Sequence, residues 1–136
     1  MNLAAIMKPQ PVTVLPDDTM NVAIRMMKEQ NFKHLPVVDR SGELVGIVSD
    51  RDLKRASPSD VTLLEVHELI YLLEKVKVSQ VMTKKPITAP PDSSVPSAAA
   101  IMVKHRIGCL PVVGAGKLVG IVTQTDLLNY LAEHGS

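Results

Sequence analysis

Two short motifs in the sequence place a hydroxyl residue three positions before an aspartate. They are Ser49-x-x-Asp52 and Thr123-x-x-Asp126, and each follows a run of Val, Ile and Leu residues. If each run is a strand and each motif opens a helix, unpaired backbone N–H groups at the helix start can bind phosphate. The aspartate, one turn inside the helix, can accept two hydrogen bonds from a vicinal diol, which ribose presents. The motifs therefore indicate two sites for a nucleotide-like ligand.

The same motifs have a purely structural interpretation. A hydroxyl residue and an acidic residue three positions later form a capping box, in which each side chain binds the other residue's backbone N–H. The motif occurs twice, each time directly after a similar apolar run, although the residues inside it change from Asp50 and Arg51 to Gln124 and Thr125. This recurrence favours ligand contact, but helix capping stays open as the alternative.

Cations that could bind a phosphate group are distributed unequally. Lys33 and His34 precede the first Leu-Pro-Val-Val segment, where the second has Gly108 and Cys109. Arg51 adjoins the first aspartate, and a guanidinium can bind phosphate through two parallel hydrogen bonds. Each cation could equally be a solvated surface charge. If they bind ligand, the sites have unequal affinity, or one is occupied and the other idle.

Metal and nucleophile chemistry find little support. His34, His67, His105 and His134 do not have the spacing of metal ligands, so no metal site is predicted. Cys109 has no activating base beside it in sequence and is interpreted as a small buried hydrophobic residue. No nucleophile or acid–base pair recurs beside the two aspartates, so we do not expect an enzyme.

The motifs lie within an internal repeat, in which Met7–Leu53 aligns with Met82–Leu127. Apolar runs, capping residues and turns predict the order strand, helix, strand, strand, helix in each copy. In the first copy the expected elements are a strand at 12–14, a helix at 20–30, strands at 35–38 and 44–48, and a helix at 49–55.

A loop at 56–60 and a helix at 62–75 are expected between the copies. One face of this helix is apolar and either covers the pair's own core or contacts a second subunit; it carries Leu63, Val66, Leu69, Ile70 and Leu73. The predicted organisation is a first repeat at 1–60, a connecting helix at 61–76 and a second repeat at 77–136.

Composition narrows the function classes. The chain has 136 residues, a formal net charge of +1 and 46% hydrophobic residues, which is enough for a packed core. The near-neutral charge and the 2% of aromatic residues argue against a nucleic-acid binder. No apolar run is long enough to span a membrane, and no signal sequence is evident, so a cytoplasmic protein is expected.

The repeated pattern of Leu-Pro-Val-Val followed by Gly-Ile-Val-Ser/Thr-x-x-Asp-Leu resembles the CBS domain, present twice as a tandem pair or Bateman module. The segments 49–59 and 67–73 are most similar to acetoin-utilisation B-type bacterial proteins, which often continue into a C-terminal effector domain. The resemblance implies an α+β fold, with the two repeats packed about a pseudo-twofold axis. It also implies frequent homodimers, and adenosine-containing ligands bound in clefts between the repeats.

The resemblance also implies roles for individual residues. Asp52 and Asp126 would grip ribose, and Ser49 and Thr123 would lie near phosphate. Lys33 and His34 would reach the phosphate held at the Asp126 site, and Arg51 would bind the phosphate at the Asp52 site. The remaining candidate contacts, to adenine or at the first strand of each repeat, are Val12, Thr13, Val37, Ile87, Thr88 and Val112. For these residues, core packing or the β-propensity of threonine is the alternative.

Two functions follow as expectations. The first is a regulatory module that binds AMP, ADP, ATP or a related adenosyl compound as a regulatory ligand, requires no cofactor, and signals occupancy by a conformational change. Its reader would be an unknown regulated protein or a missing C-terminal effector domain. The second is a structural dimerisation module with no bound nucleotide.

Overall fold

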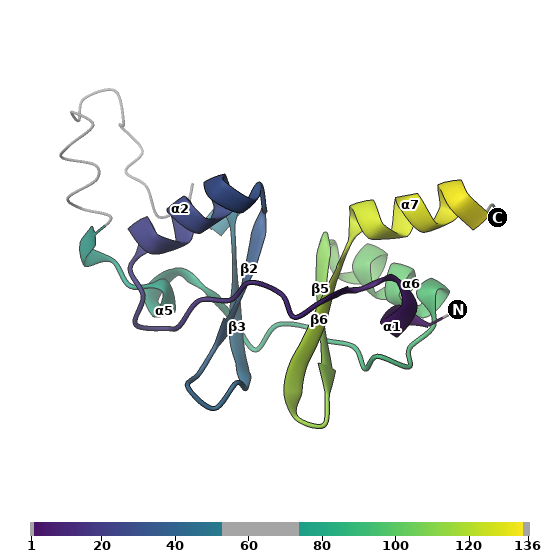
Figure 1. Cartoon of the computed structure of the whole chain (residues 1–136), viewed down its shortest axis with the longest axis horizontal. Helices are drawn as coiled ribbons and strands as arrows, with labels where there is room; N and C mark the ends of the chain where they lie inside the picture. The colour runs from purple at the N-terminus through teal and green to yellow at the C-terminus, as the bar shows by residue number, and fades with distance from the viewer. Residues whose placement is uncertain (1, 53–73, 135–136) are drawn as a thin grey trace. The chain divides into compact units, whose positions relative to one another are not determined.

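The computed structural model describes residues 2–52 and 74–134 and has the expected α+β fold (Figure 1). The chain divides into two compact units. Unit 1 comprises residues 1–11 and 87–136, and unit 2 comprises residues 12–86. Each unit contains one three-stranded sheet and its own hydrophobic core.

Unit 2 is built around a β-hairpin that follows a helix. The order of strands in its sheet is β2-β3-β4, and both pairs are antiparallel. Its elements are α2 (Met20–Gln30), β2 (His34–Val38), β3 (Leu44–Ser49), α5 (Val78–Val81) and β4 (Thr83–Lys84). A further helix starts at Asp50, and its described part ends at Asp52.

Unit 1 repeats this arrangement with a central strand β6 in the sheet order β1-β6-β5. Both pairs are again antiparallel. Its elements are α1 (Leu3–Ile6), β1 (Lys8–Pro9), α6 (Val95–His105), β5 (Cys109–Gly114), β6 (Lys117–Thr123) and α7 (Gln124–His134).

The short helix and strand that complete each sheet come from the sequence of the other repeat. In unit 1, the backbone N–H of Leu3 donates to the carbonyl of Ser93 at 2.9 Å. In unit 2, the N–H of Val78 donates to the carbonyl of Asp18 at 2.8 Å in the same way. The compact units therefore differ from a division at residues 60 and 77, which follows the sequence repeat.

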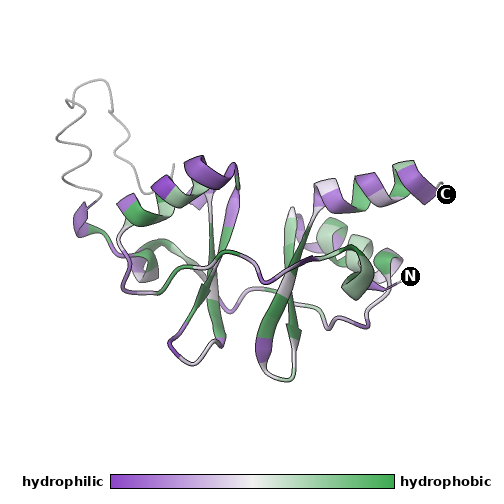
Figure 2. Ribbon diagram, in the orientation of Figure 1, coloured by the Kyte–Doolittle hydropathy of each residue, from purple (hydrophilic) through white to green (hydrophobic). Residues whose placement is uncertain are grey.

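Apolar side chains fill the space between each sheet and its helices. In unit 2 the core includes Met20, Leu35 and Val48, all with no exposed surface. Figure 2 shows the strands of both sheets as mostly hydrophobic, with polar residues on the helices and turns. The predicted burial of the Leu-Pro-Val-Val strands is confirmed, since three consecutive residues of β2 and four of β5 are buried.

Most predicted elements are confirmed, and one is reduced. The helix expected at 20–30 is α2. The strand expected at 12–14 is only a single parallel bridge between Val14 and Val37, because the prolines at 11 and 16 leave little backbone that can pair. The strands β1 and β4 were not predicted from the sequence. The expected loop at 56–60 and nearly all of the connecting helix at 62–75 lie outside the described residues.

Candidate functional site

The two Ser/Thr-x-x-Asp motifs lie where a central strand ends and a helix begins. Ser49 is the last residue of β3, and Thr123 is the last residue of β6. Strand pairing places His34 opposite Ser49, and Cys109 opposite Thr123. The sequence prediction that both motifs open a helix directly after a buried strand is therefore confirmed.

Both aspartates fold back onto the start of their own helix. Asp52 Oδ2 accepts hydrogen bonds from the Ser49 N–H at 2.9 Å and from the Ser49 hydroxyl at 3.0 Å, and the Asp52 N–H donates to Ser49 Oγ at 3.2 Å. Asp126 Oδ2 accepts from the Thr123 N–H at 2.8 Å and from its hydroxyl at 3.1 Å. The capping interpretation is thus confirmed for both residues.

Capping uses only one oxygen of each carboxylate. All of these hydrogen bonds end on Oδ2, so Oδ1 of Asp52 and of Asp126 takes no part in them. A carboxylate oxygen has two lone pairs and can accept from a ligand hydroxyl while its partner oxygen holds the cap. Capping and ligand binding are therefore compatible in this geometry.

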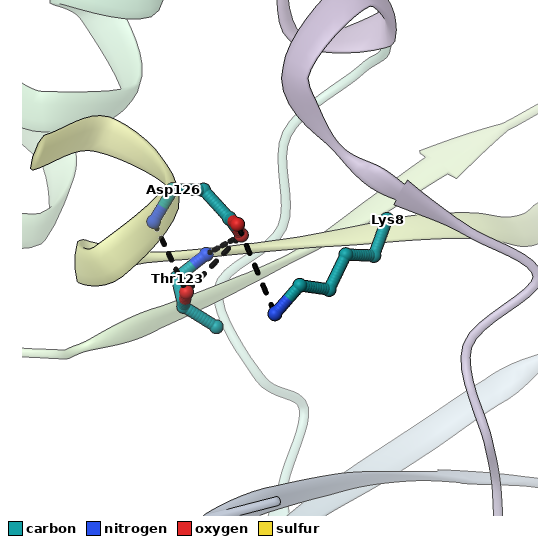
Figure 3. A network of polar contacts seen from close by, with 3 residues as sticks. All are labelled: Lys8, Thr123 and Asp126. Carbon is teal, nitrogen blue, oxygen red and sulfur yellow. Dashed lines mark hydrogen bonds and ion pairs between the residues drawn. The ribbon is translucent and has the colours of Figure 1, made fainter. Parts of the chain in front are cut away.

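Lys8 lies beside the second carboxylate (Figure 3). Its Nζ is 3.8 Å from Asp126 Oδ1, and the Asp126 side chain is 10% exposed while that of Lys8 is 56% exposed. Both residues belong to unit 1, since β1 pairs with β6. Lys8 is not among the residues predicted from sequence. The signal available there is that the first repeat has Lys8 where the second has Thr83.

In unit 2, several charged residues act on His34, which lies opposite Ser49 in the sheet. The Asp50 N–H donates to the Lys33 carbonyl at 3.0 Å, which ties the start of the helix to the residue before β2. Burial lowers the pKa of His34, Asp50 and Asp52 oppose this by raising it, and Lys33 and Arg51 lower it further. His34 thus lies near the aspartate of its own repeat. The expected contact of Lys33 and His34 with a phosphate at the Asp126 site stays a prediction.

The lowered pKa of His34 predicts a dependence of stability on pH. The unfolded chain binds a proton near pH 6.5 while the folded protein does so only at lower pH, so the free energy of unfolding falls as the pH drops below 6.5. We therefore expect the free energy of unfolding, measured with urea, to fall less between about pH 7.5 and about pH 5.5 in His34→Gln than in the wild type. His105→Gln, at an exposed position on α6, is the control. Identical pH profiles for the wild type and His34→Gln would contradict the prediction.

Cys109 occupies in unit 1 the position that His34 has in unit 2. Burial raises the pKa of its thiol to about 12, the nearby Asp126 adds to this, and Lys8 opposes it. The thiol is therefore protonated at neutral pH and is a poor nucleophile. The interpretation of Cys109 as a small buried residue is confirmed, because it is 5% exposed.

The remaining candidate contact residues differ in exposure. Val37 and Val112 have no exposed surface and belong to the cores of their own units, which favours the packing role. Val12 is half-buried and packs against the core of unit 2. Ile87 is 36% exposed and Thr88 is exposed, so both could contact a ligand.

The described residues contain neither a cluster of metal ligands nor a membrane-spanning helix. In residues 2–52 and 74–134, no three His, Cys, Asp or Glu side chains lie close enough together to hold a metal ion. Over the same residues, no helix combines the length and the apolar character needed to cross a membrane.

Three solved structures are similar to this chain over nearly its full length. A Vibrio cholerae protein named for acetoin utilization (AcuB) is 32% identical with a TM-score of 0.81, and the match covers 98% of this chain and 91% of that one. CBSX2 in complex with AMP is 27% identical with a TM-score of 0.82, covering 99% of each chain. The CBS domain pair of protein MJ0100, in complex with 5′-methylthioadenosine and S-adenosyl-L-methionine, is 28% identical with a TM-score of 0.81, and the match covers 98% of this chain and 97% of that one.

The sequence also matches a family model. The model of the CBS domain fits residues 3–59 and again residues 78–133, which together make up most of the chain. This agrees with the internal repeat, with the two similar units and with the resemblance to acetoin-utilisation proteins. The chain therefore belongs to the CBS domain family, as a tandem pair of domains.

Proposed function

We propose that the protein is a regulatory module that binds AMP, ADP, ATP or a related adenosyl compound at its two Ser/Thr-x-x-Asp motifs. The observation that carries the proposal is the matching geometry of Asp52 and Asp126. Each holds its cap with Oδ2 and keeps Oδ1 out of the cap, at the same junction of strand and helix. A helix cap alone does not require an aspartate at both places, and a carboxylate at both suits the binding of a diol.

The similar structures support the ligand class. CBSX2 was solved with AMP, and the MJ0100 domain pair with two other adenosyl compounds. AMP differs from the two others in carrying a phosphate group, so the shared part of these ligands is adenine with its ribose ring. Asp52 and Asp126 are the residues that would bind the ribose of such a ligand. Ser49, Thr123, Arg51, Lys33 and His34 are the candidates near its phosphate.

In this proposal the protein regulates a partner and catalyses no reaction. A ligand that binds one conformation more tightly than another shifts the population toward the first. A regulated protein, or an effector domain on a longer chain, would respond to that shift. Whether ligands lie between the two repeats, as the family resemblance implies, stays a prediction.

The test is ligand binding by variants that keep the helix cap. In Asp52→Asn and Asp126→Asn the amide oxygen can still accept the capping hydrogen bonds, but the amide nitrogen cannot accept from a ribose hydroxyl. We expect each variant to lose binding of AMP at its own site by about tenfold or more in titration calorimetry, with little change in thermal stability. Asp92→Asn, at an exposed position, is the control.

Two results would contradict the proposal. One is wild-type protein that shows no thermal shift with AMP, ATP or S-adenosylmethionine, since ligand at about a hundred times its Kd should stabilise the fold by about 2.7 kcal/mol. The other is unchanged affinity in both asparagine variants.

A second candidate function is a dimerisation module without nucleotide. Leu128 and Leu131 on α7 are 65% and 51% exposed, which leaves an apolar face that a second copy could cover. A stable dimer in sedimentation together with no response to any adenosyl compound would favour this function over the first.

A further inference from the structure

The Lys8–Asp126 ion pair has no counterpart at the aligned position of unit 2. Lys8 and Thr83 occupy equivalent places on β1 and β4, since each begins the short strand that completes its sheet. Nζ of Lys8 lies 3.8 Å from Asp126 Oδ1, the oxygen that the cap leaves available. Threonine has no charge and a much shorter side chain, so Thr83 cannot form an ion pair with Asp52.

Lys8 and Asp126 both lie near the thiol of Cys109, which is opposite Thr123 in the sheet. Asp126 raises the pKa of Cys109 and Lys8 lowers it. A carboxylate alone would repel an anionic ligand at this place, and an ammonium within 4 Å offsets that charge. The local charge is therefore near zero because Lys8 is present.

Unit 2 has a different set of charged residues near its motif. The groups that act on His34 are Asp50, Asp52, Lys33 and Arg51, two acidic and two basic residues. In unit 1 the aligned residues are Gln124, Asp126, Gly108 and Thr125, so both of these cations and one acid are missing. Among the described residues, the cation that the structure places beside Asp126 is Lys8, from the N-terminal strand.

We propose that Lys8 is the residue that determines the charge class of the ligand at the Asp126 site, where it favours adenosine compounds that carry a phosphate group. This rests on the proposed function. The ammonium makes no hydrogen bond to Asp126 Oδ1, because 3.8 Å is too long for one, and the lysine side chain is 56% exposed. It can therefore turn toward a phosphate while the carboxylate accepts from ribose.

The experiment measures three ligands at the Asp126 site. AMP, adenosine and S-adenosylmethionine are titrated by calorimetry into Asp52→Asn protein, in which the other site is weakened, with and without Lys8→Thr. We expect Lys8→Thr to weaken AMP by about three- to tenfold, to change adenosine by less than about twofold, and not to weaken S-adenosylmethionine, which carries a sulfonium cation and no phosphate. Lys8→Arg should keep the preference for AMP, because it keeps the charge.

The matched control is Lys84→Thr, which removes one exposed positive charge from β4, the equivalent strand of unit 2. It should leave the ratio of AMP to adenosine affinity unchanged at the Asp126 site. Circular dichroism and thermal unfolding establish that each variant is folded.

The outcomes separate this inference from the proposed function. If the wild type binds none of the three ligands, the proposed function falls and the role of Lys8 falls with it. If the wild type binds them but Lys8→Thr weakens AMP and adenosine equally, or Lys84→Thr has the same effect as Lys8→Thr, only the role of Lys8 is overturned.

Discussion

Replacing Leu3 with alanine is expected to lower the free energy of unfolding by about 2–4 kcal/mol, although the residue lies close to the start of the sequence. Its side chain has no exposed surface and belongs to the core of unit 1, together with Leu110 and Val122. The truncation would leave a cavity that the surrounding strands can fill only in part. Urea unfolding of the purified variant measures the loss.

Hydrogen exchange would show which unit is weakened. Because Leu3 packs in unit 1, we expect faster exchange in β5 and β6 of Leu3→Ala and little change in β2 and β3. Val78 is the equivalent buried residue of unit 2, so Val78→Ala should give the reverse pattern. Ala4→Ser, next to Leu3 but exposed, is the control. If Leu3→Ala lost protection first in β2 and β3, this would contradict the placement of residues 1–11 in unit 1.

Replacing Gly120 with valine is expected to cost about 2–3 kcal/mol by overpacking. A Cβ atom at Gly120 would lie 2.8 Å from Met7 Cγ and 3.1 Å from the Lys8 carbonyl oxygen, and it would also meet the methionine sulfur. The methionine can move, but the carbonyl belongs to β1, whose pairing with β6 fixes it. The strand must therefore shift or detach, which chemical denaturation would detect.

A double-mutant cycle can isolate the clash. Gly120→Ala and Met7→Ala should each destabilise unit 1, but together they should cost less than the sum, because the shorter side chain makes room for the new methyl group. Gly108→Ala is the control, since its Cβ would lie 3.4 Å or more from the nearest atoms, which belong to the Gln124 side chain. Strict additivity of Gly120→Ala and Met7→Ala would show that the contact does not limit the packing.

The fold could be predicted from sequence where local signals agree with tertiary packing. The helix at 20–30 has apolar residues on one face and ends at Asn31 in a left-handed conformation, which asparagine tolerates well. The two hairpins were also predicted, because continuous Val, Ile and Leu runs flank a turn. The helix starts at Ser49 and Thr123 were predicted from their capping residues.

The parts that sequence did not predict depend on contacts between distant segments. Strands of two residues, such as β1 and β4, carry no periodic pattern, and they form only because a longer strand offers a free edge. The Lys8–Asp126 ion pair could not be predicted for the same reason. More than a hundred residues separate it from Asp126 in the chain, and only the pairing of β1 with β6 brings them together.

The packing of residues 1–11 with residues 87–136 also affects the order in which the chain folds during synthesis. Unit 2 is one continuous stretch, residues 12–86, and can close as soon as it has left the ribosome. Unit 1 needs both residues 1–11 and residues 87–136, so its first strand must wait without a partner until the last hairpin has been made. Closing such a long loop is entropically unfavourable and slow. We therefore expect unit 2 to fold first on the nascent chain, and β1 to pair only after β6 has been synthesised.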